Sequence, residues 1–210
     1  MSQSRAKGPL LRPPVIHFLS LLAVMLVFMT DDNNSISPDI RSYVERLRAL
    51  LADTPPLEVL GTTVGTIEDL TRGLENSRVT YRPLPGKWSI SEIVAHLSDS
   101  ETASRFRFRQ ILTLPDGCAI PAYDQDAWAE VSGNSEIPLA DSLELFSALR
   151  RSNLRLWQSL TPAQLAKFGQ HQERGRESVE DLLVLVAGHD VNHLNQIRRI
   201  ISQAAAEETK

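Results

Sequence analysis

Cysteine is almost absent from this chain of 210 residues, which has only Cys118. A single cysteine excludes an internal disulfide and the cysteine-rich zinc sites, so a bound metal must be held by histidine or carboxylate side chains. Positive charge is also scarce, because 22 Lys and Arg stand against 26 Asp and Glu, for a formal net charge of -4. Without a basic excess to balance phosphates, we expect no nucleic-acid partner.

Strand patterns and internal repeats are lacking as well. No sustained alternation of apolar and polar residues occurs, whereas apolar residues recur at helical spacing almost throughout the chain beyond Ser37. Hydrophobic residues make up 42% of the chain, which is enough for one sizeable core. The sequence therefore predicts one all-α domain over residues 37–210.

A long apolar run is found only in the N-terminal extension, residues 1–36. Three basic residues precede the run at residues 15–29, which has features of a secretory signal but is followed by no small-x-small cleavage site. It is also shorter than the roughly 20 residues that span a bilayer. We favour a physiological start at Met25 or Met29 and a cytoplasmic protein. The alternatives are a signal and a membrane anchor formed by residues 15–28.

Turn residues and helix caps divide the folded part into helices. The clearest start is Ser89, because the sequence from Ser89 to Glu92 matches a capping box, with Trp88 placed to pack on Ile93 as a hydrophobic staple. The pattern predicts helices over about residues 38–51, 57–75, 89–113, 139–157 and 178–200, with short helices at 123–128 and after Thr161.

Four of these helices, which are long, amphipathic and joined by polar connectors, predict a four-helix bundle. The connector between the helices at 89–113 and 139–157 has about 25 residues, enough to return along the bundle, so these two helices can run parallel. Short joints elsewhere favour antiparallel neighbours.

His189 and His193 form the most informative motif of the chain. Residues four apart share a helix face about 6 Å apart along the axis, close enough to share one cation. His96 lies on the inward stripe of the helix at 89–113. If that helix is an antiparallel neighbour of the helix at 178–200, the three rings converge inside the bundle, where bundle metal sites are built.

Three neutral imidazoles suit Zn²⁺ or Ni²⁺ and leave a coordination position for water or substrate. In a tetrahedral site the coordinating nitrogens lie roughly 3 to 3.5 Å apart. The alternative is that each histidine is a hydrogen-bonded core or rim residue. The residues alone leave both interpretations open.

Four further polar residues are candidates for the site. Asp99 follows His96 by three positions and is placed to orient a ligand imidazole or to act as a base, with a solvated helix carboxylate as the alternative. Gln196 is a candidate for binding substrate or a ligand ring. Tyr123 and Asp124 lie in the long connector and are candidate pocket residues, with packing and N-cap roles as the alternative.

Other polar residues are interpreted as structural. We expect His171, in a polar run, to be a solvated loop residue, and Cys118 to be an inert loop residue. A basic cluster on the helix at 89–113 predicts a solvated, salt-bridged face rather than an anion site. Its members are Arg105, Arg107 and Arg109.

Segments 87–101, 122–130 and 189–197, in this order and spacing, resemble the DinB-like superfamily and more closely its YfiT branch. The resemblance covers about residues 40–201. It implies a four-helix bundle of up-down-down-up topology, a metal held by His96, His189 and His193, and a homodimer. The N-terminal extension departs from the cytosolic members of the family.

Activities in the resembled family include metal-dependent hydrolysis, isomerisation and transfer of low-molecular-weight thiols such as bacillithiol or mycothiol. We therefore expect a metal-dependent enzyme acting on a small-molecule substrate. Water at the open position would make it a hydrolase, and a thiol there would make it an S-transferase. The alternative is a non-catalytic, metal-stabilised bundle in stress response or protein interaction.

Overall fold

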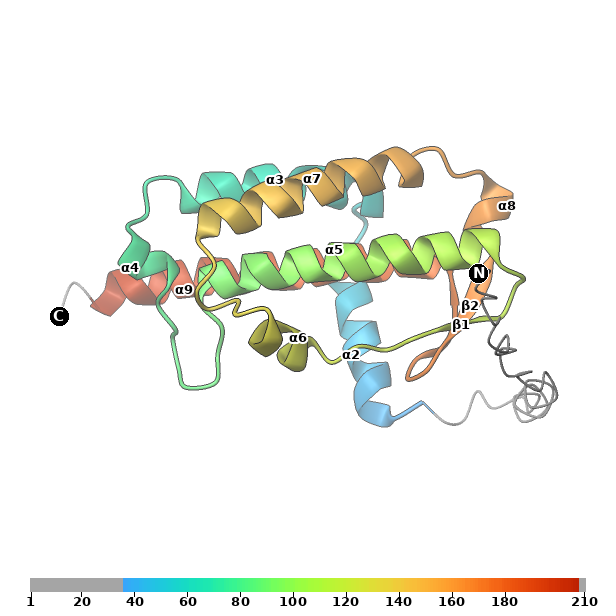
Figure 1. Cartoon of the computed structure of the whole chain (residues 1–210), viewed down its shortest axis with the longest axis horizontal. Coiled ribbons are helices and arrows are strands. Elements are labelled where there is room, and N and C mark those ends of the chain that lie inside the picture. Colours follow the sequence, from blue (N-terminus) through green and yellow to red (C-terminus); the bar gives the residue numbers. More distant parts are fainter. Residues whose placement is uncertain (1–35, 208–210) are drawn as a thin grey trace, which may run out of the picture. The chain divides into compact units, whose positions relative to one another are not determined.

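The computed structural model describes residues 36–207, which are mostly helical (Figure 1). In chain order the elements are α2 (Pro38–Ala49), α3 (Pro56–Thr71), α4 (Asn76–Val79), α5 (Ile90–Thr113), β1 (Cys118–Ile120), α6 (Gln125–Val131), α7 (Leu139–Trp157), α8 (Pro162–Leu165), β2 (Phe168–His171), β3 (Gly175–Ser178) and α9 (Val179–Glu207). The predicted signal, anchor or start falls outside these residues. Within them, no helix has both the length and the apolar character required to cross a membrane.

Helices α3, α5, α7 and α9 form a four-helix bundle. Figure 1 shows α5 and α7 running in one direction, while α3 and α9 run in the other. In chain order the topology is up-down-down-up, and the predicted parallel course of α5 and α7 is confirmed. The connector that allows it, residues 114–138, contains β1 and α6.

The predicted capping box starts α5. The backbone N–H of Glu92 donates to Ser89 Oγ over 3.3 Å, and the backbone N–H of Ser89 donates to Glu92 Oε2 over 2.9 Å. Two helix ends differ from expectation. Helix α3 stops at Thr71 rather than at residue 75, since Gly73 adopts a φ of 75° that no helix continues through. Helix α9 continues past residue 200 to Glu207.

The bundle core has two apolar layers with a polar layer between them. One apolar layer is centred on Phe108 of α5 and Trp157 of α7, and the other on Phe146 of α7 and Ile197 of α9. Along α5, α7 and α9 the residues between these layers include buried polar side chains. They are Glu101, Ser104, Arg150, Asn153, Asp190 and His193.

Helix α2 lies against α9 at a close approach. A Cβ atom added at Gly188 would lie 2.2 Å from the carbonyl oxygen of Leu47, so the crossing requires glycine at this position. The adjacent residue on α9 is His189. The crossing therefore places α2 beside the part of α9 that carries the histidine pair.

The mostly helical fold predicted from the sequence is confirmed, but the described residues also include strands that the sequence pattern did not predict. Three short strands form a sheet of order β1-β2-β3, in which β1 is parallel to β2 and β2 is antiparallel to β3. Each strand has only three or four residues, too few to show a period-2 pattern. The sheet lies by the C-terminal end of α5 (Figure 1).

Candidate metal centre

Three histidines from two helices converge in the bundle. His96 comes from α5, and His189 and His193 come from successive turns of α9. The Nε2 atom of His189 is 3.1 Å from Nε2 of His96 and 3.0 Å from Nε2 of His193. These separations are close to the roughly 3 to 3.5 Å expected for nitrogens around one tetrahedral cation. The structure thus brings together the three residues selected from the sequence.

The hydrogen bonds of His193 define which of its ring nitrogens carries the proton. Its Nδ1 lies 3.2 Å from Gln196 Oε1, an acceptor, so Nδ1 donates and Nε2 presents a lone pair to the other rings. Gln196 therefore contacts a histidine of the cluster, and it does not line the cavity described below. His96 Nδ1 is buried and lacks a hydrogen-bond partner among residues 36–207.

All three rings are neutral at pH 7. Burial, and the nearby His193, lower the pKa of His96 to about 3. Burial lowers the pKa of His193 to about 4, against the opposing effect of Asp190. Burial and the two neighbouring rings lower the pKa of His189 well below 6.5. Neutral rings with converging nitrogens fit a borderline divalent cation, because a metal binds the unprotonated imidazole and protons compete only weakly for rings with such low pKa values.

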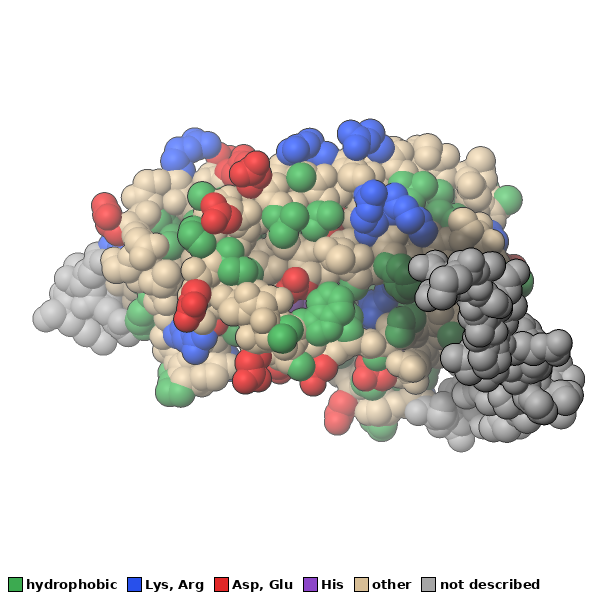
Figure 2. Space-filling model, in the orientation of Figure 1, with side chains coloured by type: hydrophobic (Ala, Val, Ile, Leu, Met, Phe, Trp, Pro, Cys, Tyr) green, Lys and Arg blue, Asp and Glu red, His purple; other side chains and the backbone are tan. Residues whose placement is uncertain are grey.

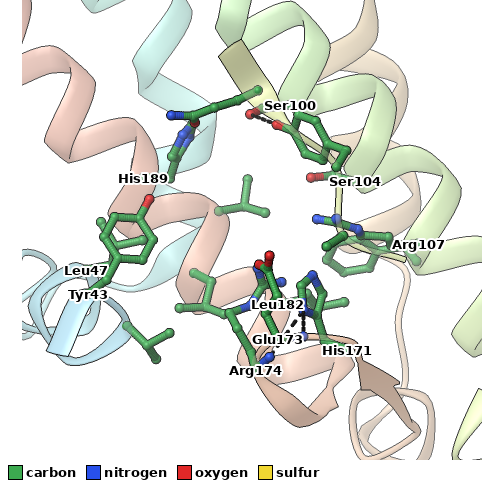
Figure 3. Close-up of a pocket in the computed structure, with 17 residues that line it drawn as sticks. Tyr43, Leu47, Ser100, Ser104, Arg107, His171, Glu173, Arg174, Leu182 and His189 are labelled. Atoms are coloured by element: carbon green, nitrogen blue, oxygen red, sulfur yellow. Dashed lines mark hydrogen bonds between the residues drawn. The ribbon is translucent and has the colours of Figure 1, made fainter. Parts of the chain in front are cut away.

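One side of the cluster is covered and the other is open. The indole of Trp88 lies with its ring centroid 4.7 Å from that of His96 and 6.4 Å from that of His193. These two histidines are 1% and 5% exposed, and Figure 2 shows almost no histidine surface on the face drawn. His189 is partly exposed and lines a cavity of about 340 Å³ (Figure 3).

Of the predicted pocket residues, the cavity includes Tyr123 but not Asp124. The Tyr123 hydroxyl pairs with Ser100 Oγ over 3.0 Å, beside the cavity. Asp124 caps α6 by accepting from the backbone N–H groups of residues 126 and 127. Asp99 is half-buried and accepts a hydrogen bond from Asn134 over 3.2 Å. Asn134 follows α6 in the chain, and within residues 36–207 no hydrogen bond joins Asp99 to a histidine ring.

His171 is not the solvated loop residue that we expected. It lies in β2, is 3% exposed, and its Nδ1 accepts hydrogen bonds from the backbone N–H groups of Glu173 and Arg174. Burial, with the nearby Arg174 and Arg107 guanidinium groups, lowers its pKa to about 3. The ring lines the same cavity as His189. The buried position of His171 could not be predicted from the sequence, because it depends on β2, a strand too short to recognise from its pattern.

The basic cluster of α5 is not a salt-bridged face in the part of the chain that the structure describes. Arg105 donates to Ser152, Arg109 donates to the Arg105 carbonyl, and Arg107 turns into the cavity. Arg107 therefore points to different surroundings from Arg105 and Arg109 despite their proximity in sequence. On a helix, residues two positions apart are rotated by about 200° around the axis. Arg107 therefore faces nearly the opposite side from Arg105 and Arg109.

The sequence also did not predict a buried ionic network that lies beside the histidine cluster. Arg150 donates to Asp190 Oδ2 over 2.7 Å and to Glu101 Oε1 over 2.9 Å, and Asn153 donates to Glu101 Oε2 over 2.7 Å. Arg150 also donates to the carbonyl of Leu60 over 2.9 Å. The network joins α3, α5, α7 and α9. Its signal in the sequence was a charged residue, Arg150, on the apolar stripe of α7.

Comparison with known proteins agrees with this geometry. The profile DinB_2, described as DinB superfamily, matches residues 60–197, a segment that contains all three histidines. A "Putative metal-dependent hydrolase" of Oceanobacillus iheyensis is 30% identical over 143 residues, covering 68% of this chain and 78% of that protein. A protein of Halalkalibacterium halodurans with the same description is 25% identical over 145 residues, covering 69% of this chain and 84% of that protein.

Among solved structures, YfiT from Bacillus subtilis has a similar fold. It is described as "a probable metal-dependent hydrolase with an unusual four-helix bundle topology". The match has a TM-score of 0.62 at 22% sequence identity and covers 82% of this chain and 94% of that one. Because the family profile matches residues 60–197, which make up most of the bundle, the chain belongs to the DinB superfamily.

Proposed function

We propose that this protein is a metal-dependent hydrolase of small molecules, in which His96, His189 and His193 hold one divalent cation, Zn²⁺ or Ni²⁺. The observation that carries the proposal is the convergence of three neutral imidazoles through their Nε2 atoms, at 3.0 and 3.1 Å, beside a cavity. The relatives described as metal-dependent hydrolases support the same class of activity.

A divalent cation bound by three imidazoles lowers the pKa of a coordinated water to about 7 and polarises a carbonyl oxygen. The residues of this chain prepare the site for that chemistry. Gln196 fixes the His193 tautomer by accepting from Nδ1, as second partners of ligand histidines usually do. Trp88 excludes water from the His96 and His193 side, which leaves the side facing the cavity for substrate.

The first test is the metal content of the full-length protein, measured after incubation with Zn²⁺ or Ni²⁺ and removal of unbound ion. We expect one equivalent in the wild type and at least a tenfold loss in His193→Ala. His171→Asn is the matched control, because His171 is a buried histidine outside the cluster. Equal metal content in wild type and His193→Ala would overturn the assignment.

The second test is activity of the metal-loaded protein on a panel of small esters and amides, with and without low-molecular-weight thiols. Hydrolysis that is lost in His193→Ala supports the proposal. Thiol conjugation without hydrolysis would reassign the protein as an S-transferase, since a thiol can take the same open position as water. Stoichiometric metal with neither activity would favour the non-catalytic bundle.

A further inference from the structure

The cavity beside His189 is lined by more positively than negatively charged side chains. Two guanidinium groups line it, from Arg107 and Arg174, together with one exposed carboxylate, Glu173. Arg174 is already neutralised, because its Nη2 donates to Glu177 Oε2 over 3.0 Å and its Nε bonds the other oxygen of the same carboxylate. The charge of Arg107 is not matched in this way.

Arg107 is held in place by neutral groups. It donates to the carbonyl oxygen of Pro121 over 2.7 Å, and its guanidinium carbon lies 5.3 Å from the centre of the Tyr123 ring. No ion pair to Arg107 is found within residues 36–207. A partly buried guanidinium without a carboxylate partner has unused N–H donors and is well suited to bind an oxyanion.

His171 lines the same cavity and carries a second donor without a partner. Because its Nδ1 accepts two backbone N–H groups, the single proton of the neutral ring must be on Nε2. That Nε2–H is buried and has no hydrogen-bond partner within the described part of the chain. Buried donors without partners are rare and point to a ligand group. Figure 3 shows Arg107 and His171 on one side of the cavity and His189 and Tyr43 on the other.

We propose that Arg107 and His171 bind the carboxylate group of the substrate, and that the opposite end of the same molecule reaches the His189 side of the cavity. This inference rests on the proposed function for the identity of the reacting end, but not for the carboxylate site itself. The cavity, of about 340 Å³, accommodates a small molecule. One unmatched cation with Glu173 nearby favours a single negative charge over the two of a phosphate ester.

The test is ligand-observed ¹⁹F NMR of the full-length protein with three probes: 4-fluorobenzoate, 4-fluorobenzamide and 4-fluorophenyl phosphate. Because a carboxylate also coordinates metals, each titration is run with metal and with excess chelator. We expect 4-fluorobenzoate to bind at least about tenfold more tightly than the amide in both conditions, as charge-assisted hydrogen bonds predict. Equal affinities, no binding of benzoate, or tighter binding of the phosphate ester would overturn the proposal without reference to any variant.

Variants then assign the preference to residues. Arg107→Met should abolish the difference between benzoate and benzamide, and Arg107→Lys should retain part of it. Arg105→Met is the matched control, because Arg105 is on the same helix but donates to Ser152 outside the cavity. Glu173→Gln should tighten benzoate binding, since it removes a negative charge from the cavity lining. An unchanged preference in Arg107→Met would overturn the assignment.

The two proposals fail in different ways. If benzoate binding needs Arg107 but the protein binds no metal, the carboxylate site stands and the metal-dependent hydrolase does not. If benzoate binds only in the presence of metal and is indifferent to Arg107, the metal centre stands and the carboxylate site is overturned.

Discussion

Arg150 holds together the polar layer of the bundle through one guanidinium group. Its charge is shared between Asp190 of α9 and Glu101 of α5, and all three side chains are at most 2% exposed. Carboxylates in such surroundings are stabilised as anions only while their cation is present. Burial raises the pKa of Glu101 despite Arg150 beside it, which shows how strongly this layer disfavours an unpaired charge.

Replacing Arg150 with methionine should lower the free energy of unfolding by roughly 3–5 kcal/mol, because it leaves two buried carboxylates without a cation. The neighbouring Arg151→Met is the control: Arg151 is exposed and donates to Ser147, so its replacement should change stability by less than about 0.5 kcal/mol. Urea denaturation of both variants measures the difference. Similar stabilities would show that the network contributes little.

His171 should make stability depend on pH. Its pKa is about 3 in the folded protein, where the ring is neutral, and near 6.5 when unfolded. Between these values the unfolded state binds the extra proton, so this contribution is complete above pH 6.5 and falls by up to about 1.4 kcal/mol per pH unit as the pH drops. His171→Asn keeps an acceptor for the two backbone N–H groups but does not titrate. The stability of the wild type relative to this variant should therefore decline from pH 6.5 to 4, and a constant difference would contradict the pKa shift.

The sequence was most informative where a local rule applied to a single residue. The pair His189 and His193 could be found because helical spacing puts them on one face, and His96 because it lies on an apolar stripe of α5. Arg107 and His171 could not be found in this way. Their meeting depends on how β2 and the connector before α6 return to α5, and no local pattern encodes that approach.

At the scale of the elements, α9 can cross α2 closely because residue 188 is a glycine and has no side chain. Gly188→Ala would place a methyl group against the backbone of Leu47, so α2 must shift. We expect a loss of about 1–3 kcal/mol in the free energy of unfolding, as for other overpacked contacts.

A helical glycine with free space provides the control for this prediction. Gly65 of α3 has nothing within 4 Å of an added Cβ. Gly65→Ala should therefore stabilise the protein by roughly 0.5–1 kcal/mol, through helix propensity alone. In thermal unfolding, the melting temperature should fall in Gly188→Ala and rise in Gly65→Ala. A loss of stability in both would indicate that propensity does not govern α3.

Helices were predicted more completely than strands for a physical reason. A capping box and a long amphipathic stripe, as at Ser89 and along α5, are local signals that repeat over several turns. The strands β1, β2 and β3 are stabilised by pairing with one another rather than by their own sequences. Gly169 illustrates this, since a Cβ there would lie 2.6 Å from the Ile120 side chain on the paired strand.

For the whole molecule, a cation at the histidines would link two helices that begin at opposite ends of the bundle. A ligand that binds the folded state alone stabilises it by about 4 kcal/mol when its free concentration is 1,000 times its dissociation constant. We therefore expect the free energy of unfolding to rise with Zn²⁺ concentration in the wild type and to stay flat in His193→Ala. Denaturation across a zinc series buffered with a chelator checks this, and parallel curves for the two proteins would argue against a site in the folded state.

The topology itself could be anticipated only in part. The length of the 114–138 connector allowed α5 and α7 to run parallel, and the family resemblance implied the same arrangement. Neither source indicated that the core would consist of two apolar layers separated by a charged one. That division arises from tertiary packing of Arg150 with residues from three other helices.

The position of Trp88 gives the protein a built-in optical reporter. Its indole lies with the ring centroid 4.7 Å from that of His96, so an open-shell ion such as Ni²⁺ at the histidines should quench its fluorescence, whereas closed-shell Zn²⁺ should not. Trp88→Phe should remove the quenching and leave the emission of Trp128 and Trp157. Binding of either ion could then be followed in unlabelled protein, with Zn²⁺ detected by its competition against Ni²⁺.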